Sequence, residues 1–350
     1  MSFSLPPLHQ RDRASIDFLG ALGKASFPLR GAVDKHIADK GMAADLLPDD
    51  LDERTDVMID TLSDSKAFRV QQLLGEWHAE YMAKVTDEAF DAVKEEAMER
   101  IDALHNGQSQ VHLDPDLEPP AYWDGVDFHR TKGGWDAHEY AGLVHGELIH
   151  KRLVDRLYPG GIFKTRRFVA GLAPQDHYDE ILDMGCSTGH YTTALQETYP
   201  DAKITGVELS PSTLEHAARI ANSNGWAWDL YQRAAEDTKF EDNRFDLVTS
   251  FILLHEIPAD VVRAVFREAF RVAKPGGDMI MSDVTRYADM DKMGVWRADY
   301  GAQVGGEPWW RESASLDLAQ VAEEAGFVDV KAWGEAPMNY PYIVKGRKPE

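Results

Sequence analysis

The alternation of strand-like and helix-like segments after about residue 175 constrains the fold of this chain more than any other feature. Amphipathic segments of helical length, such as the one that Ser210 caps and Gly225 ends, separate short apolar segments. This alternation predicts an α/β fold in which helices cover a parallel sheet. Seven strands are expected, at residues 180–184, 203–208, 228–232, 245–250, 278–283, 327–333 and 340–346. Only GEAPMN joins the last two, which is too short for a crossover helix, so the final pair should be antiparallel.

The chain before about residue 175 has long amphipathic segments and no strand alternation. In residues 86–107, Thr86 is a helix cap and Gly107 a stop. One face of this segment carries an apolar stripe of Phe90, Val93, Ala97, Ile101 and Leu104. Residues 106–120 are polar and rich in proline, which indicates a connector. We therefore expect an all-helical N-terminal domain over residues 1–120.

Composition excludes some classes of partner. Lys and Arg total 37 against 60 Asp and Glu, which gives a formal net charge of −23 and makes nucleic acid an unfavourable partner. No segment near the N-terminus has the apolar core of a signal peptide, and no run of about 20 apolar residues is present, so we expect a cytoplasmic protein with no membrane partner. The single cysteine, Cys186, has no internal disulfide partner, which suits a reducing compartment.

The segment ILDMGCSTGHYTTAL, residues 181–195, places a loop of small residues where the first strand hands over to a helix. Gly185 permits a tight turn and Gly189 lets the backbone approach a ligand, at the sheet edge where α/β proteins bind ligands. The third glycine of a dinucleotide-binding turn is missing, which disfavours a nicotinamide-dependent oxidoreductase. Glu208 ends the next strand and is suitably placed to accept hydrogen bonds from two ribose hydroxyls.

Five ordered segments carry a family resemblance: ILDMGCSTG, ITGVELS, AAEDTKFEDNRFDLV, AFRVAKPGGDMIMSD and the terminal strand pair. Together they resemble the class I S-adenosylmethionine-dependent methyltransferases over about residues 165–350. The resemblance implies a seven-stranded Rossmann-like sheet of order 3-2-1-4-5-7-6 with the last strand antiparallel, and S-adenosyl-L-methionine as cofactor. It also implies an S-adenosylmethionine-binding domain at 175–350 with a lid insert at 284–314, and linking helices over the cofactor pocket at 121–174.

The resemblance implies a set of cofactor contacts at these strand ends. They are Asp183, Gly185, Cys186, Ser187, Gly189, Glu208, Leu209, Ala235, Glu236 and Ser250. Ser187 replaces the family's middle glycine, and Ala234 replaces its usual acid, so Glu236, Asp237 or the backbone must recognise the adenine amino group. For Cys186, a catalytic thiol is one interpretation, and a small side chain that lets the ligand approach is the other.

The expected chemistry is in-line methyl transfer, in which alignment of the reacting atoms supplies much of the rate enhancement. His255 follows the fourth strand, where many natural-product O-methyltransferases have a His-Asp-Trp general base, and here the segment reads His255-Glu256-Ile257. We therefore predict His255 and Glu256 as catalytic residues, because a hydroxyl acceptor must lose a proton. The alternative is that His255 only shapes the pocket.

Two further segments supply candidate substrate contacts. If the chain is helical from Asp136, His138 and His145 share a face, and Tyr140 or His145 would face the cofactor or substrate. This segment lacks the paired-histidine spacing of a zinc helix, so no metal is predicted. The insert holds seven large side chains: Tyr287, Met290, Met293, Trp296, Tyr300, Trp309 and Trp310. They predict a lid over the substrate, with Trp296 and Tyr300 as contacts, or else a core against the N-terminal helices.

The acceptor is expected to be a small apolar or aromatic molecule, methylated at oxygen with His255 as the base. Methylation at nitrogen or carbon with a structural His255, and a non-methylating cofactor-binding protein, stay open as alternatives. The role of the N-terminal helices is also open between substrate cover and the interface of a homodimer.

Overall fold

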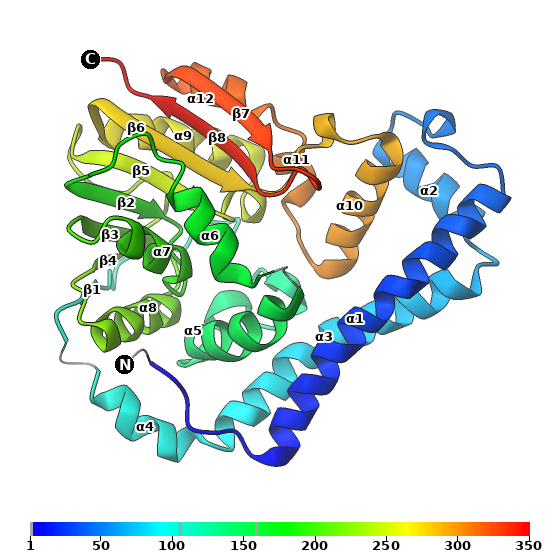
Figure 1. The fold of residues 1–350 in the computed structure, drawn as a ribbon, viewed down its shortest axis with the longest axis horizontal. Helices are drawn as coiled ribbons and strands as arrows, with labels where there is room; N and C mark the ends of the chain where they lie inside the picture. Colours follow the sequence, from blue (N-terminus) through cyan, green and yellow to red (C-terminus); the bar gives the residue numbers. More distant parts are fainter. Residues whose placement is uncertain (1–2, 105–106, 158–159) are drawn as a thin grey trace.

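The computed structural model, which describes residues 3–104, 107–157 and 160–350, contains an eight-stranded sheet (Figure 1). Its order is β1-β4-β3-β2-β5-β6-β8-β7. The strands are β1 Gln110–His112, β2 Glu180–Met184, β3 Lys203–Glu208, β4 Asp229–Gln232, β5 Phe245–Phe251, β6 Ala273–Asp283, β7 Val328–Gly334 and β8 Tyr342–Arg347. Strand β8 is antiparallel to both β6 and β7, as expected, and the other pairings are parallel.

The prediction of seven strands and of an all-helical N-terminal domain is wrong because of β1. This strand pairs in parallel with β4, with Val111 opposite Leu230. It is three residues long and lies in the proline-rich stretch that indicated a connector, so no period-2 pattern marks it. The other seven strands follow the order β4, β3, β2, β5, β6, β8, β7, which is 3-2-1-4-5-7-6 when counted from β2.

Helices cover both faces of the sheet because consecutive strand side chains point to opposite sides. In β2, Ile181 packs in a core with α6 Ile162–Ala170, α7 His190–Thr198 and α8 Pro211–Asn224. Leu182 packs in the opposite core with α9 Ala259–Val272 and α12 Leu318–Ala325. The carboxyl ends of β2, β3 and β5 therefore open between two packed layers of helices.

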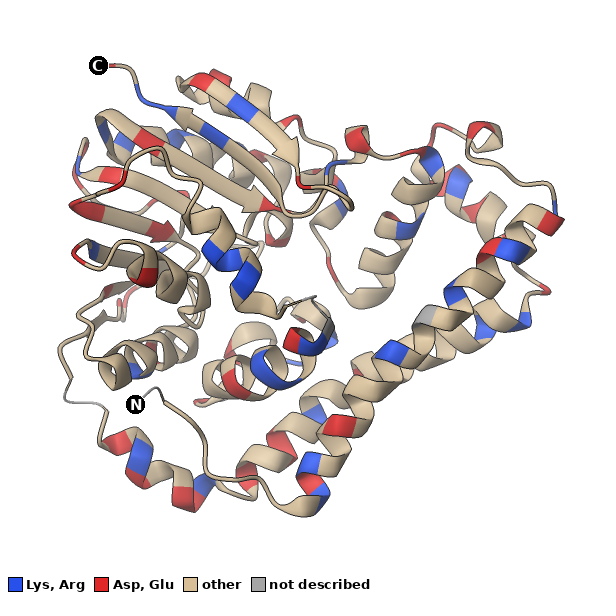
Figure 2. Cartoon of the chain, in the orientation of Figure 1, with Lys and Arg blue, Asp and Glu red and all other residues tan. Residues whose placement is uncertain are grey.

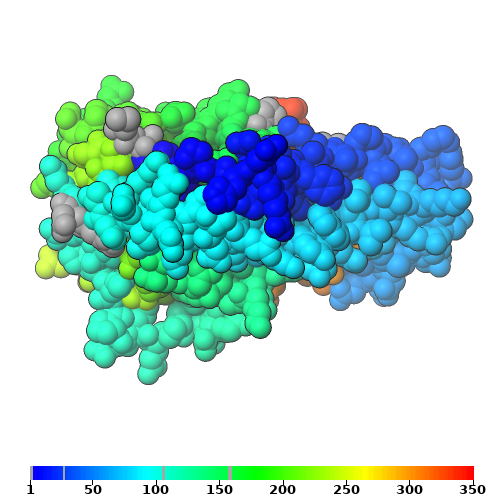
Figure 3. Space-filling view, turned by 90° about the horizontal axis from the view of Figure 1, so that it is seen from below, coloured from blue at the N-terminus to red at the C-terminus, as the bar shows by residue number. Residues whose placement is uncertain are grey.

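The N-terminal region forms a long arm along one side of the molecule. Helices α1 Gln10–Asp39 and α3 Lys66–Asp91 lie side by side over its length, as both views show (Figures 1 and 3). The helix predicted to begin at Thr86 is wrong in its start: Thr86 lies inside α3, and α4 Lys94–Asp102 follows a break. The predicted stripe is nevertheless buried, with Phe90 and Ile101 in one core with α1. The predicted end of that helix includes residues 105–106, which lie outside the described residues.

The insert after β6 packs on this arm. Trp296, on α10 Lys292–Gly305, lies in a core with Phe68 of α3 and with Met58 of α2 Leu51–Thr61. The remaining helical segments are η1 Ala44–Leu46, η2 Phe128–Arg130, η3 Gly134–Asp136, α5 Ala141–Val144, η4 His145–Leu153, η5 Val154–Leu157, η6 Leu254–Glu256, η7 Tyr287–Asp289 and α11 Trp310–Ala314. Acidic residues are spread over the helices and strand ends rather than gathered in one patch (Figure 2). In the described part of the chain, no helix combines the length and the apolar character needed to cross a membrane.

Candidate active site

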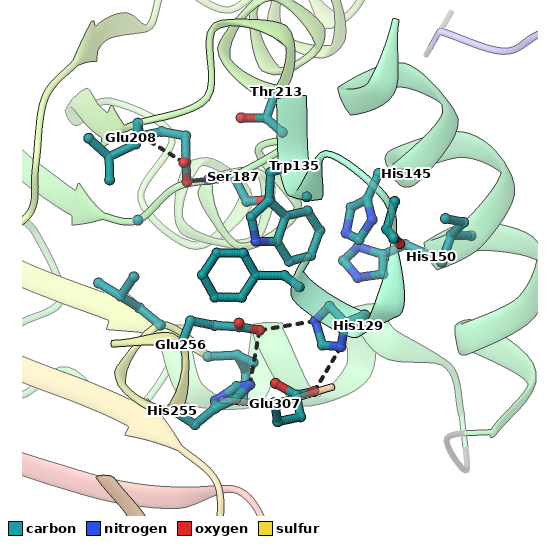
Figure 4. A pocket seen from close by; sticks show the side chains of 18 of the residues that line it. His129, Trp135, His145, His150, Ser187, Glu208, Thr213, His255, Glu256 and Glu307 are labelled. Atoms are coloured by element: carbon teal, nitrogen blue, oxygen red, sulfur yellow. Dashed lines mark hydrogen bonds and ion pairs between the residues drawn. The ribbon is translucent and has the colours of Figure 1, made fainter. Parts of the chain in front are cut away.

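A cavity of about 570 Å³ lies where the carboxyl ends of β2, β3 and β5 meet the segment between β1 and α6 (Figure 4). Its volume falls in the usual range for small-molecule sites. Nine of the predicted site residues line it: Gly185, Ser187, Glu208, Leu209, Ala235, Glu236, His145, His255 and Glu256. The sheet edge and the N-terminal half of the chain thus build one site together.

The glycine loop presents bare backbone to this cavity. Gly185, Ser187 and Gly189 have φ values of +72°, +46° and +77°, the left-handed region in which glycine is at ease and serine is not. A Cβ added to Gly185 would lie 2.9 Å from Leu253 Cδ1, another cavity-lining side chain. The turn therefore requires glycine at 185, and the absent side chain leaves room for a ligand.

Glu208, at the end of β3, holds the loop and faces the same cavity. Its carboxylate accepts hydrogen bonds from the backbone N–H groups of Ser187 at 3.2 Å, Leu209 at 2.8 Å and Ser210 at 3.0 Å. Burial raises the pKa of Glu208 to about 7, although these N–H groups lower it. Its oxygens retain capacity for further donors, so the residues present fit the ribose hydroxyls of an adenosyl cofactor.

The side of the cavity expected to hold adenine includes a residue that the sequence did not indicate. Ala235 and Glu236 follow β4, and the Tyr122 hydroxyl donates to both Glu236 oxygens at 2.8 and 2.9 Å. Burial and the nearby Glu236 carboxylate raise the pKa of Tyr122 above its usual range. The tyrosine orients this carboxylate at the cavity wall.

Four of the predicted cofactor residues are buried behind the loop and do not line the cavity: Asp183, Cys186, Gly189 and Ser250. Cys186 packs against Gly206, where an added Cβ would lie 2.7 Å from its Sγ, and burial raises the pKa of the thiol well above its usual value. This placement does not fit a catalytic thiol. Asp183 accepts a hydrogen bond from Thr192 Oγ1 at 2.7 Å, and burial raises its pKa to about 7.

His255 is held on both sides by carboxylates. Its Nδ1 lies 2.8 Å from Asp283 Oδ1 and its Nε2 lies 3.4 Å from Glu256 Oε1. Burial opposes a charge on the ring, but the two carboxylates outweigh it and raise the pKa of His255 well above the usual value. Neither ring nitrogen is free to take a proton from an acceptor.

His129 and Glu307 extend this group, and neither was predicted. His129 Nε2 lies 3.0 Å from Glu256 Oε1, and its Nδ1 lies 2.7 Å from Glu307 Oε1. Among the described residues, His129, Glu256 and Glu307 are the group whose potential ligand atoms lie within 4.8 Å of one another. They come from the linking segment 121–174, the chain after β5 and the insert, so no local spacing could have revealed them.

The predicted substrate residues separate into two groups. His145 lines the cavity at the start of a π-helical segment, 4.3 Å between ring centroids from Trp135, and burial lowers its pKa to about 3. Tyr140, Trp296 and Tyr300 do not line the cavity, because Tyr140 packs against Phe90 and the other two belong to the core around Phe68. We therefore do not place these three side chains against the substrate. The expected helix from Asp136 begins instead at Ala141.

Comparisons with known proteins find methyltransferases among the relatives of this chain. A family model described as a methyltransferase domain matches residues 181–277. The demethylmenaquinone methyltransferase of Symbiobacterium thermophilum is 31% identical over 191 residues, which cover 47% of this chain and 74% of the relative. The ubiquinone/menaquinone biosynthesis C-methyltransferase UbiE of Desulfotalea psychrophila is 33% identical over 122 residues, or 35% of this chain and 48% of the relative. The solved structure of phosphoethanolamine N-methyltransferase 2 from Haemonchus contortus matches this chain with a TM-score of 0.49 at 14% sequence identity. The match covers 66% of this chain and 61% of the Haemonchus chain.

The fold and the glycine loop define a Rossmann-like methyltransferase. The chain belongs to the class I S-adenosylmethionine-dependent methyltransferases, and its cofactor is S-adenosyl-L-methionine. It spans about half the length of several of the curated relatives it matches.

Proposed function

We propose that this enzyme transfers the methyl group of S-adenosyl-L-methionine to a small acceptor with an apolar or aromatic body, bound beside the cofactor in the described cavity. The observation that carries the proposal is the shared cavity. Ser187 and Glu208, which fit the cofactor, line the same space as aromatic side chains from the linking segment 121–174 and the insert: Trp123, Phe128, Trp135 and Trp310. Such walls favour flat apolar groups, and their faces attract cations such as a sulfonium.

The cofactor supplies an activated methyl group when bound, and the chain supplies alignment and exclusion of water. Glu208 would hold the ribose hydroxyls, Glu236 with Tyr122 would face the adenine, and the bare turn at Gly185 would leave room for the methionine portion. An acceptor packed against Trp135 and Trp310 would then lie in the same cavity as the methyl group. Alignment of this kind can account for several kcal/mol of barrier reduction, on the order of 7–11 kcal/mol in well-oriented systems.

The acceptor atom follows from the environment of His255. Because both of its ring nitrogens already face carboxylates, we propose a positioning role for His255 rather than that of general base. This favours an acceptor that needs no base from His255, at nitrogen or at an acidic carbon. The relatives include a C-methyltransferase, which supports carbon as a candidate. Oxygen with His255 as base is less well supported.

The direct test has two parts. Calorimetry should detect binding of S-adenosylhomocysteine, and incubation of the enzyme with cell extract and isotope-labelled S-adenosylmethionine should produce a species that gains one labelled methyl group. The Glu208→Ala variant is expected to lose both signals. Binding without any labelled product from extracts would point to the non-methylating alternative, and absence of binding would refute the cofactor assignment.

A further inference from the structure

Two histidines that are far apart in the sequence direct the same ring nitrogen at one carboxylate in the cavity wall. His129 Nε2 lies 3.0 Å and His255 Nε2 lies 3.4 Å from Glu256 Oε1. All three side chains line the cavity, and the contacts between them are visible in the close view (Figure 4).

Each imidazole also has a carboxylate at its other nitrogen. His255 Nδ1 lies 2.8 Å from Asp283 Oδ1, and His129 Nδ1 lies 2.7 Å from Glu307 Oε1. A histidine that ligates a metal usually donates its remaining ring N–H to a carboxylate or carbonyl, which fixes the tautomer and the ring orientation. Here a carboxylate lies at the Nδ1 of both imidazoles, so a neutral ring that donates its Nδ1–H would have its Nε2 available to a metal ion bound in place of the proton now shared with Glu256.

The two rings are also held in place by packing. Trp310 lies edge-on to His255 with ring centroids 5.0 Å apart, and Trp135 lies edge-on to His129 at 5.3 Å. The backbone of His129 has a φ of +52°, a conformation that costs free energy for a residue with a side chain. Strain of this kind is commonly retained at functional sites.

Glu256 has a bonding capacity that the described residues do not fill. The residue is only 9% exposed, and its Oε2 atom has no hydrogen-bond partner within the described part of the chain. A buried carboxylate oxygen without a donor or a cation is costly, so this atom points to a ligand. The buried Oε2 atom of Glu307 also has no hydrogen-bond partner among the described residues.

The charges of the group leave room for a divalent ion. Asp283, Glu256 and Glu307 contribute three carboxylates, and Arg286 lies 3.5 Å from Asp283 Oδ1. With the two imidazoles neutral, as metal ligation requires, one divalent ion would balance the two remaining negative charges.

We propose that His129, His255 and Glu256 bind one divalent transition-metal ion, with Asp283 and Glu307 as positioning residues for the two imidazoles. Two nitrogen donors and one carboxylate suit Zn²⁺, Mn²⁺ or Fe²⁺ rather than Ca²⁺, which prefers oxygen ligands alone. Because the three side chains line the cavity, further coordination positions of a bound ion would be open to it. If the proposed function is also correct, an oxygen atom of the acceptor would occupy one of them.

Calorimetric titration of the metal-depleted full-length protein with Zn²⁺, and separately with Mn²⁺, tests the site. We expect one ion per chain, at least a 100-fold loss of affinity in His255→Asn and Glu256→Gln, and a loss of about 10- to 100-fold in Glu307→Gln, which removes only an outer partner. Asp87→Asn is the matched control, because Asp87 pairs with His138 at 3.2 Å in the same cavity but outside this group. Its affinity should equal that of the wild type.

Binding of neither ion in stoichiometric amount, or equal losses in the control and the ligand variants, would overturn the proposal. If a ligand variant fails to fold, wild-type crystals loaded with Zn²⁺ decide the question. An anomalous peak about 2.0–2.2 Å from His129 Nε2 and from Glu256 supports the site, and a peak elsewhere overturns it. S-adenosylhomocysteine binding is measured in parallel, so that failure of the cofactor assignment is separated from failure of the metal site.

Discussion

The Glu208→Gln substitution gives the sharpest test of the cofactor site. Hydrogen bonds to a charged acceptor contribute about 1.5–3 kcal/mol each, so two ribose hydroxyls on Glu208 account for about 3–6 kcal/mol of cofactor binding. Glutamine retains one neutral acceptor worth about 1 kcal/mol, so we expect a loss of about 2–5 kcal/mol, or roughly 30- to 4,000-fold in affinity. Calorimetry with S-adenosylhomocysteine at pH 8 measures it.

The pH dependence provides a second signature of the same carboxylate. Because burial raises the pKa of Glu208 to about 7 and the hydroxyls donate to its ionised form, affinity should be full above about pH 8 and fall about tenfold for each unit below pH 7. In Glu208→Gln this dependence should disappear. Glu215→Gln, on α8 and paired with Arg219 at 2.9 Å, is the control and should behave as wild type. A loss of less than threefold in Glu208→Gln, or an unchanged pH profile, would refute the reasoning.

Three further predictions concern stability. Burial raises the pKa of Asp183 from 3.8 to about 7, so the free energy of unfolding should fall as pH rises from about 4 to about 7 and level off above that. Asp183→Asn should increase the free energy of unfolding at pH 8 by about 1–3 kcal/mol and flatten its pH dependence in urea titrations, and an equal change at pH 5 and pH 8 would contradict this. Gly189→Ala should destabilise more than Gly225→Ala, because both have positive φ but only at 189 would the new Cβ lie 2.8 Å from Trp228; equal midpoints would refute the steric argument. Trp296→Ala should cost about 3–5 kcal/mol of stability by calorimetry yet leave cofactor affinity unchanged in the folded protein, and the reverse pattern would restore its lid role.

Local pattern was sufficient for seven of the eight strands and for the glycine loop at which we propose that the cofactor binds. The strands at 180–184 and 203–208 occur as predicted, because buried parallel strands read as short apolar runs and their helices carry cap and stop residues. The turn at Gly185 was also predictable, since few sequences place glycines and small residues at the end of such a strand. Glu208 follows from the same logic, as the acid that ends the adjacent strand.

Residues brought together only by tertiary packing were not predictable in this way. His129 and Glu307 meet because η2 and the insert pack over the cavity, and nothing in either local segment encodes that distance. Trp296 illustrates the opposite error: a large aromatic in an insert suggests a lid, yet its partner Phe68 is more than two hundred positions away in the chain. The composition of the insert alone could not distinguish a lid over the substrate from a core packed against the N-terminal helices.

Strand β1 bears on how the enzyme can be divided. Because Gln110–His112 occupies the outer side of β4, the amide and carbonyl groups along that side are capped by the chain itself. A shortened version beginning just before β2 would bare this edge, which is a ready template for adhesion to strands of other molecules. A well-behaved catalytic fragment must therefore retain these three residues, even if the helical arm is removed.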